Sequence, residues 1–144
     1  MDYSRRDLGL LLSALAVTNA ATNAAAMSAT LGSKTYQYDD LPVSVNGQNR
    51  GRAILKGETH AGVPIELHET ELAPGERPHA PHHHLHEEMV LVREGTLEVT
   101  IGGNSANLGT GSVAYVASNE EHGWRNVGTG RARYFVLALG RDDA

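Results

Sequence analysis

A dense group of histidines at residues 82–86 has a spacing that suits metal binding. Four of the chain's eight histidines fall within these five positions. Alternate side chains of an extended segment point to the same side, so His82 and His84 can hold one ion between them. Glu88, four residues after His84, can supply a harder carboxylate ligand, and a fourth ligand must come from elsewhere in the fold. His122 is the only histidine C-terminal to this group.

The remaining histidines have plainer interpretations. A histidine run can be a solvated loop or an expression tag, but tags lie at chain termini and this run is interior. His83 has the opposite parity to His82 and His84, as does Leu85, and both are expected to face outward. His60 and His68 are interpreted as surface or packing residues.

The elements that must position these side chains are predicted to be short β-strands. Sixteen glycines against one Phe and one Trp favour strands joined by tight turns over a helix bundle. Residues 96–101 alternate Leu, Val and Ile with Glu and Thr, the pattern of a half-buried strand, and Gly102-Gly103-Asn104 predicts a hairpin turn. Further strands are expected at residues 52–58, 64–72, 88–93, 112–117 and 131–139. Many short strands at regular spacing predict a closed sandwich or small barrel.

The histidine stretch resembles the first motif of the cupin superfamily. That motif is a glycine, a short spacer, His-x-His, three or four residues, Glu, six residues and Gly. His82, His84, Glu88 and Gly95 stand at these spacings, and Gly75 lies one residue further away than is usual.

A second segment resembles the second cupin motif, which is Gly, five residues, Pro, one residue, Gly, two residues, His, three residues and Asn. Gly111, His122 and Asn126 match it, while Ala117 replaces the usual Pro and Asn119 the usual Gly. The two replacements affect a turn and no ligand. Asn tolerates the left-handed backbone conformation better than most residues, so the turn is expected to survive.

The resemblance covers about residues 52–140 and implies an all-β fold, a small jelly-roll β-barrel with a metal inside its mouth. It carries over His82, His84, Glu88 and His122 as ligands of one divalent transition metal. Three imidazoles and one carboxylate suit Fe, Mn, Ni, Cu or Zn. Further coordination positions would stay open for water, O2 or substrate.

Four other side chains are candidates for the walls of a substrate pocket. Trp124 follows His122 by two residues and shares its side of a strand, although the chain's only Trp could instead fill the barrel core. Tyr115 and His79 are further candidates, the latter at the mouth. His86 shares the parity of His82 and His84 but could lie in the turn. Asn126 is interpreted as structural.

The first 26 residues have the features of an export signal. Arg5 and Arg6 precede an apolar run of ten residues, Leu8–Val17, which is shorter than the roughly 20 needed to span a bilayer. Residues 24–26 are alanines and offer a cleavage site. The segment resembles a twin-arginine signal, although Leu8 stands where Phe is usual and the following Lys is lacking. A general secretory signal or a retained amphipathic N-terminus are the alternatives.

Length and composition limit the remaining possibilities. The 144 residues fit one domain. We divide the chain into a signal peptide at 1–26, an irregular arm at 27–50 and the barrel at 51–144. The net charge of -5, without a Lys/Arg-rich stripe, disfavours a nucleic-acid partner. The absence of cysteine excludes disulfides and thiolate metal sites. A periplasmic or secreted protein is expected, with no stable membrane association after cleavage.

The function predicted from these features is a mononuclear metal-dependent enzyme acting on a small molecule. The resemblance includes dioxygenases, isomerases, lyases and decarboxylases, and the fold does not select among them. The alternative is a non-catalytic periplasmic protein that binds a small ligand or a metal. A third interpretation is a metal that only stabilises the barrel. Cupins often pair, so a homodimer is plausible.

Overall fold

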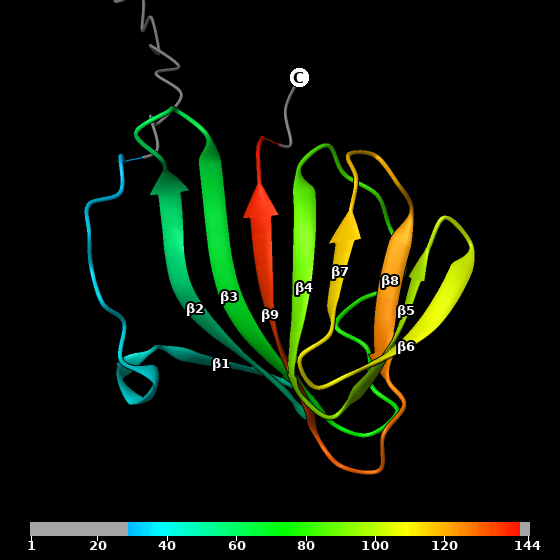
Figure 1. Cartoon of the computed structure of the whole chain (residues 1–144). Helices are drawn as coiled ribbons and strands as arrows, with labels where there is room; N and C mark the ends of the chain where they lie inside the picture. Colours follow the sequence, from blue (N-terminus) through cyan, green and yellow to red (C-terminus); the bar gives the residue numbers. More distant parts are fainter. Residues whose placement is uncertain (1–28, 142–144) are drawn as a thin grey trace, which may run out of the picture.

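The computed structural model describes residues 29–141, and the predicted export signal lies outside this range. The described residues form one short 3-10 helix and nine β-strands (Figure 1). None of their helices is long and apolar enough to cross a membrane. The elements in chain order are η1 (Tyr38–Asp40), β1 (Val43–Asn46), β2 (Asn49–Glu58), β3 (Pro64–Leu72), β4 (Glu87–Glu94), β5 (Thr96–Ile101), β6 (Asn104–Gly109), β7 (Val113–Val116), β8 (His122–Asn126) and β9 (Ala132–Leu139).

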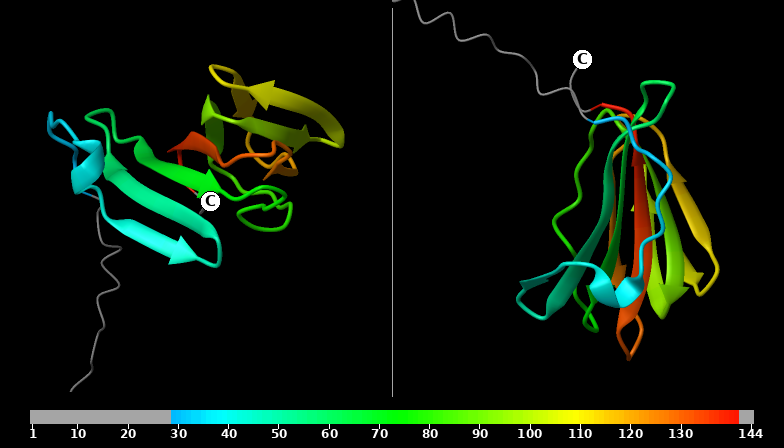
Figure 2. Two further views of the ribbon diagram at one scale, coloured as in Figure 1. Left: turned by 90° about the horizontal axis from the view of Figure 1, so that it is seen from below. Right: turned by 90° about the vertical axis from the view of Figure 1, so that its left-hand side faces the viewer.

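The strands form two antiparallel sheets that enclose a shared apolar core. The larger sheet has the order β1-β2-β3-β9-β4-β7 and the smaller the order β6-β5-β8. Seen from below, the large sheet curves towards the small one (Figure 2). The core draws on both sheets and comprises Leu72, Val90, Val92, Leu97, Val99, Trp124, Ala132, Tyr134 and Val136. The prediction of an all-β fold is confirmed.

The hairpin predicted from the alternating residues 96–101 is confirmed in detail. Leu97 and Val99 are buried in the core, as the period of two requires. Gly102 and Gly103 form the two-residue turn to β6, with φ values of 53° and 79°. Two consecutive positive φ angles suit the right-handed twist of a hairpin, and glycine adopts them without steric cost.

Three strands were not among the predicted strand ranges, and each has few apolar residues or exposed ones. The two valines of β1 are exposed, β6 has only Leu108 as a large apolar residue, and β8 has only Trp124, which was expected to share one side of a strand with His122. We expected residues 27–50 to be irregular, but β1 and the beginning of β2 lie in this range, joined by a turn at Gly47. Pairing with a neighbouring strand, which a local pattern does not reveal, stabilises these segments.

The register of the large sheet sets which residues share its inner face with Glu88. Glu88 on β4 pairs with Ala138 on β9, and Ala138 pairs with Glu66 on β3. Paired residues point to the same face of a sheet, so Glu66 lies on the same side as Glu88, two strands away. The adjacent row on this face is Val90, Val136 and His68.

The outer face of the same sheet holds a buried ion-pair cluster. Glu71 on β3 accepts a hydrogen bond of 2.8 Å from Nε of Arg133, and Arg131 lies 3.0 Å from its other oxygen. Burial alone would raise the pKa of Glu71, but the hydrogen bond from Arg133 and the charges of Arg133, Arg131 and Arg50 together hold it below its ordinary value. Glu71 is therefore a charged, paired group that ties β3 to β9.

Candidate metal centre

Two separate segments bring His82 and His122 together. His82 lies in the loop between β3 and β4, and His122 is the first residue of β8. The two residues form an isolated antiparallel bridge, in which each backbone N–H donates to the carbonyl of the other at 3.0 and 2.9 Å. This bridge fastens the histidine loop to the small sheet and aligns the two imidazoles.

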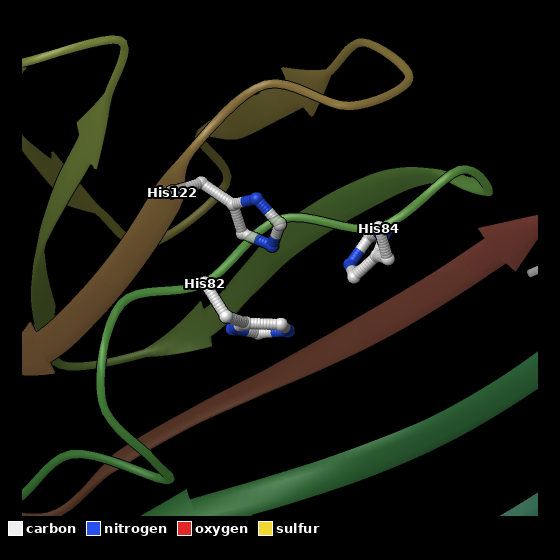
Figure 3. Close-up of side chains that lie close together, drawn as sticks. All are labelled: His82, His84 and His122. Carbon is white, nitrogen blue, oxygen red and sulfur yellow. The ribbon is translucent and has the colours of Figure 1, made fainter.

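The rings of His82, His84 and His122 point toward one another (Figure 3). Their centroids are 5.1, 4.8 and 4.7 Å apart for the three pairs. Glu88, at the beginning of β4, closes the group: its Oε2 lies 3.3 Å from Nε2 of His122, and its Oε1 lies 3.6 Å from Nε2 of His84. The structure thus brings together all four side chains that the motifs singled out.

The nitrogen and oxygen atoms of this cluster that could bind a metal ion lack hydrogen bonds. Within the described part of the chain, six buried side-chain nitrogen or oxygen atoms have no hydrogen-bond partner. Four of them belong to the cluster: His82 Nδ1, His84 Nε2, Glu88 Oε2 and His122 Nε2. An unsatisfied buried polar atom costs about 1–3 kcal/mol, so four in one place need an explanation. A bound cation would satisfy them.

Backbone contacts set the tautomers of two imidazoles. Nδ1 of His84 lies 2.8 Å from the carbonyl oxygen of His86, and Nδ1 of His122 lies 2.8 Å from that of Glu120. A carbonyl oxygen only accepts, so each Nδ1 carries the proton and donates it. Each Nε2 is then left with a lone pair that faces the cluster, which is how a metal-binding histidine is usually oriented.

Electrostatics also favour neutral imidazole at His82. Burial, followed by the neighbouring rings of His79, His122 and His84, lowers the pKa of His82. The neutral form is the one that binds a metal ion. The chemistry of this donor set, with three imidazoles and one carboxylate, fits a divalent transition metal.

Two of the predicted pocket residues lie directly against the cluster. Trp124 stacks on His122 at a centroid distance of 5.7 Å, and its Nε1–H donates to the hydroxyl of Tyr134 at 2.7 Å. Trp124 therefore belongs to the core and borders the cluster at the same time. The rings of His79 and His82 meet edge to face, with centroids 4.2 Å apart. A pocket of about 110 Å³ that His79 and Trp124 help to line also involves Glu98 and Thr100, whose parity on β5 is opposite to that of the core, so it opens on the outer face of the small sheet and is lined by none of the four clustered side chains.

The other two pocket candidates differ from each other. His86 joins the cluster, because its ring stacks on His84 at 3.5 Å and its Nε2 lies 3.3 Å from Oε1 of Glu88. Tyr115 does not. Its neighbour on β7, Val116, is buried and pairs with Glu88, so Tyr115 points to the opposite face and is 50% exposed. The expectation that Tyr115 lines the pocket is corrected accordingly.

The Asn119 departure from the second motif is accommodated as expected. Asn119 has a φ of 62°, the left-handed conformation that the usual glycine would adopt, and its N–H donates to the carbonyl of His84 at 2.7 Å. Asn126 is structural: its Nδ2 donates to the carbonyls of Leu72 and Gly130, and its Oδ1 accepts from Gly128.

Two polar residues on the inner face, His68 and Glu66, are not among the predicted site residues. His68 was interpreted as a surface or packing residue, but it shares the inner face with Val136 and its Nδ1 lies 3.8 Å from Oε1 of Glu66. Burial lowers the pKa of His68, although Glu66 and Glu88 act to raise it. Glu66 in turn accepts a hydrogen bond of 2.7 Å from Lys56. The parity of His68 with the buried Leu72 was the available signal.

Comparison with known proteins agrees with this geometry. A family model described as a cupin domain matches residues 68–138. This range of the chain is similar to a cupin domain and includes His82, His84, Glu88 and His122. No curated protein sequence matches this chain.

Solved structures share the fold at low sequence identity. An RmlC-like cupin from Shewanella frigidimarina has a TM-score of 0.64 and 16% identity, with coverage of 78% of this chain and 95% of that one. A polyketide cyclase from Streptomyces resistomycificus has a TM-score of 0.62 and 18% identity, covering 78% and 83%. A predicted oxalate decarboxylase from Thermotoga maritima has a TM-score of 0.62 and 14% identity, covering 75% and 100%. These similarities establish the fold of the chain, and its chemistry has to be argued from its own residues.

Proposed function

We propose that this protein binds one divalent transition metal through His82, His84, Glu88 and His122. The observation that carries the proposal is a set of four buried side-chain atoms without hydrogen bonds. Ligand atoms of His82, His84 and His122 lie within 4.8 Å of one another, and Oε2 of Glu88 lies 3.3 Å from Nε2 of His122. The protonated Nδ1 atoms of His84 and His122 support it, since they leave Nε2 lone pairs on the inner side. Fe, Mn, Ni, Cu and Zn all suit this ligand set.

The proposed activity is that of a metal-dependent enzyme acting on a small molecule, of the dioxygenase, isomerase, lyase or decarboxylase type. When bound, the metal supplies a Lewis acid or a redox centre. The side chains around it support a substrate site: Trp124 offers an apolar wall, and Glu66 with His68 offers polar groups on the same inner face as Glu88. A small polar molecule that binds at the metal and extends across Ala138 would contact both Glu66 and His68.

A matched pair of variants tests the metal site. Glu88 and Glu87 are adjacent, but only Glu88 lies in the cluster, so Glu88→Ala should lower metal occupancy and Glu87→Ala should not. Equal losses in both variants would contradict the ligand set. Turnover of a small-molecule panel by the metal-loaded wild type, lost in Glu88→Ala, would support an enzyme. Saturable binding without turnover would support the non-catalytic alternative.

Export is a separate part of the proposal and rests on residues 1–26. The twin-arginine pathway carries folded proteins, so the metal could be inserted in the cytoplasm, where free copper and zinc are kept low. An N/O site would otherwise favour these two metals. A reporter fused to residues 1–30 should stay inside cells that lack the twin-arginine translocase. Normal export from such cells would contradict this route.

A further inference from the structure

His86 contacts two of the proposed ligands at once. Its ring stacks on His84, with centroids 3.5 Å apart and an interplanar angle of 11°. Its Nε2 lies 3.3 Å from Oε1 of Glu88, and its side chain is only 17% exposed. Nitrogen and oxygen atoms of His86, His84 and Glu88 lie within 4.8 Å of one another, so His86 is placed either to bind the metal or to act on a residue that does.

The stacking argues against His86 as a ligand to the same ion as His84. The lone pair of an imidazole nitrogen lies in the ring plane, and a metal binds along it at about 2.0–2.1 Å. Two nearly parallel rings stacked face to face direct their lone pairs along separate, parallel planes. An ion in the plane of His84 would therefore lie well outside the plane of His86.

The contact with Glu88 divides the roles of the two carboxylate oxygens. A carboxylate only accepts, so Nε2 of His86 carries a proton and donates it to Oε1 of Glu88. Oε2 of Glu88 has no hydrogen bond and lies 3.3 Å from Nε2 of His122, on the side of the cluster. One oxygen is thus held by His86, and the other is left for a cation.

We propose that His86 is a positioning residue that orients Glu88 for metal binding. Its hydrogen bond to Oε1 and its stacking on His84 fix the carboxylate so that Oε2 faces the metal. The assignment rests on the proposed metal site. It adds His86 as a fifth side chain that supports the four ligands without binding the metal itself. Hydrogen-bonding partners of metal ligands commonly contribute 10- to 100-fold to metal affinity. An effect of this size is expected for His86.

Titration of Mn²⁺ into metal-stripped, full-chain protein tests the assignment. His86→Ala should bind Mn²⁺ roughly 10- to 100-fold more weakly than the wild type. His86→Gln, whose amide can still donate to Oε1 of Glu88, should recover most of this loss. His83→Ala is the matched control, because His83 is an exposed neighbour in the same loop, and it should bind as the wild type does.

The Co²⁺ absorption spectrum separates positioning from ligation. At saturating Co²⁺, His86→Ala should keep the position and intensity of the wild-type visible bands, because the ligands are unchanged. A changed spectrum, or a loss of binding as complete as that of His84→Ala, would show that His86 is a ligand and overturn the assignment. Equal Mn²⁺ affinity in the wild type and His86→Ala would also overturn it.

The same titration distinguishes this inference from the proposed function. If the folded wild type binds no Mn²⁺ and no Co²⁺, the metal site itself is wrong, and the assignment of His86 falls with it. If the wild type binds and His86→Ala binds equally well, only the assignment fails. Should His86→Ala not fold, the comparison of His86→Gln with His86→Leu supplies the same contrast between a donor and a side chain without one.

Discussion

Glu88→Gln should make the metal-free protein more stable while weakening its metal site. In the structure, Oε2 of Glu88 and Nε2 of His122 lie 3.3 Å apart, and both are hydrogen-bond acceptors without a donor. An amide in place of the carboxylate puts an N–H donor between them. Its oxygen can still accept from His86, so the substitution satisfies two buried atoms and removes a buried charge.

The magnitude follows from these contacts. Each unsatisfied buried polar atom costs about 1–3 kcal/mol, and the weaker hydrogen bond from His86 to a neutral oxygen offsets part of the gain. A net stabilisation of roughly 1–2 kcal/mol is expected for the metal-free protein. For a domain of this size, that corresponds to an increase in Tm of about 4–8 °C. Glu87→Gln, outside the cluster, should stay within about 0.5 kcal/mol of the wild type.

Urea unfolding with and without metal is the assay. In chelator, Glu88→Gln should unfold at a higher urea concentration than the wild type. Metal at 100 times the wild type's Kd should stabilise the wild type by about 2.7 kcal/mol and the variant by less, so the stability advantage of the variant should shrink or be lost. If Glu88→Gln is less stable than the wild type in chelator, the unpaired acceptors are not arranged as the structure shows, and the reasoning is refuted.

Three further predictions concern the residues that hold the site in place. Tyr134→Phe leaves the indole N–H of Trp124 buried without an acceptor and should lower the free energy of unfolding by about 1–3 kcal/mol in urea. Asn119→Gly should be tolerated. Asn119→Val would be forced to a φ of 62°, so it should lower the free energy of unfolding by about 1–3 kcal/mol, seen as a lower Tm. The folded pKa of Glu71 lies below its ordinary value of 4.5, so its stabilising contribution is complete above that pH and is lost as the pH falls through the folded pKa. Unfolding of Glu71→Gln, followed from pH 6 to pH 3, should therefore show a shallower loss of stability than the wild type.

The part of the site that depends on short spacing could be predicted from the sequence. His82, His84 and Glu88 lie within seven positions, and parity along an extended chain places the two histidines together. His122 required the family motif, because its bridge to His82 joins segments forty residues apart and leaves no local trace.

The errors come from assigning faces by residue type instead of by neighbours. Tyr115 was chosen as an aromatic residue, but the burial of Val116 next to it decides its direction. His68 was dismissed although it shares the parity of Leu72, because the buried Glu69 and Glu71 on the opposite face hide the alternation of β3. The bounds of β8 were not predicted because Trp124 is its only large apolar residue. His122 belongs to the site and Asn126 to a turn, and neither residue type is typical of a buried strand.

The metal content of the purified protein tests the proposed centre most directly. The chain would be folded in the cytoplasm and purified without a histidine tag and without added metal, and its metals would be measured by mass spectrometry. About one equivalent of Fe, Mn, Ni, Cu or Zn, lost on His122→Ala, is the predicted result. A folded protein that contains no metal and accepts none on titration would contradict it.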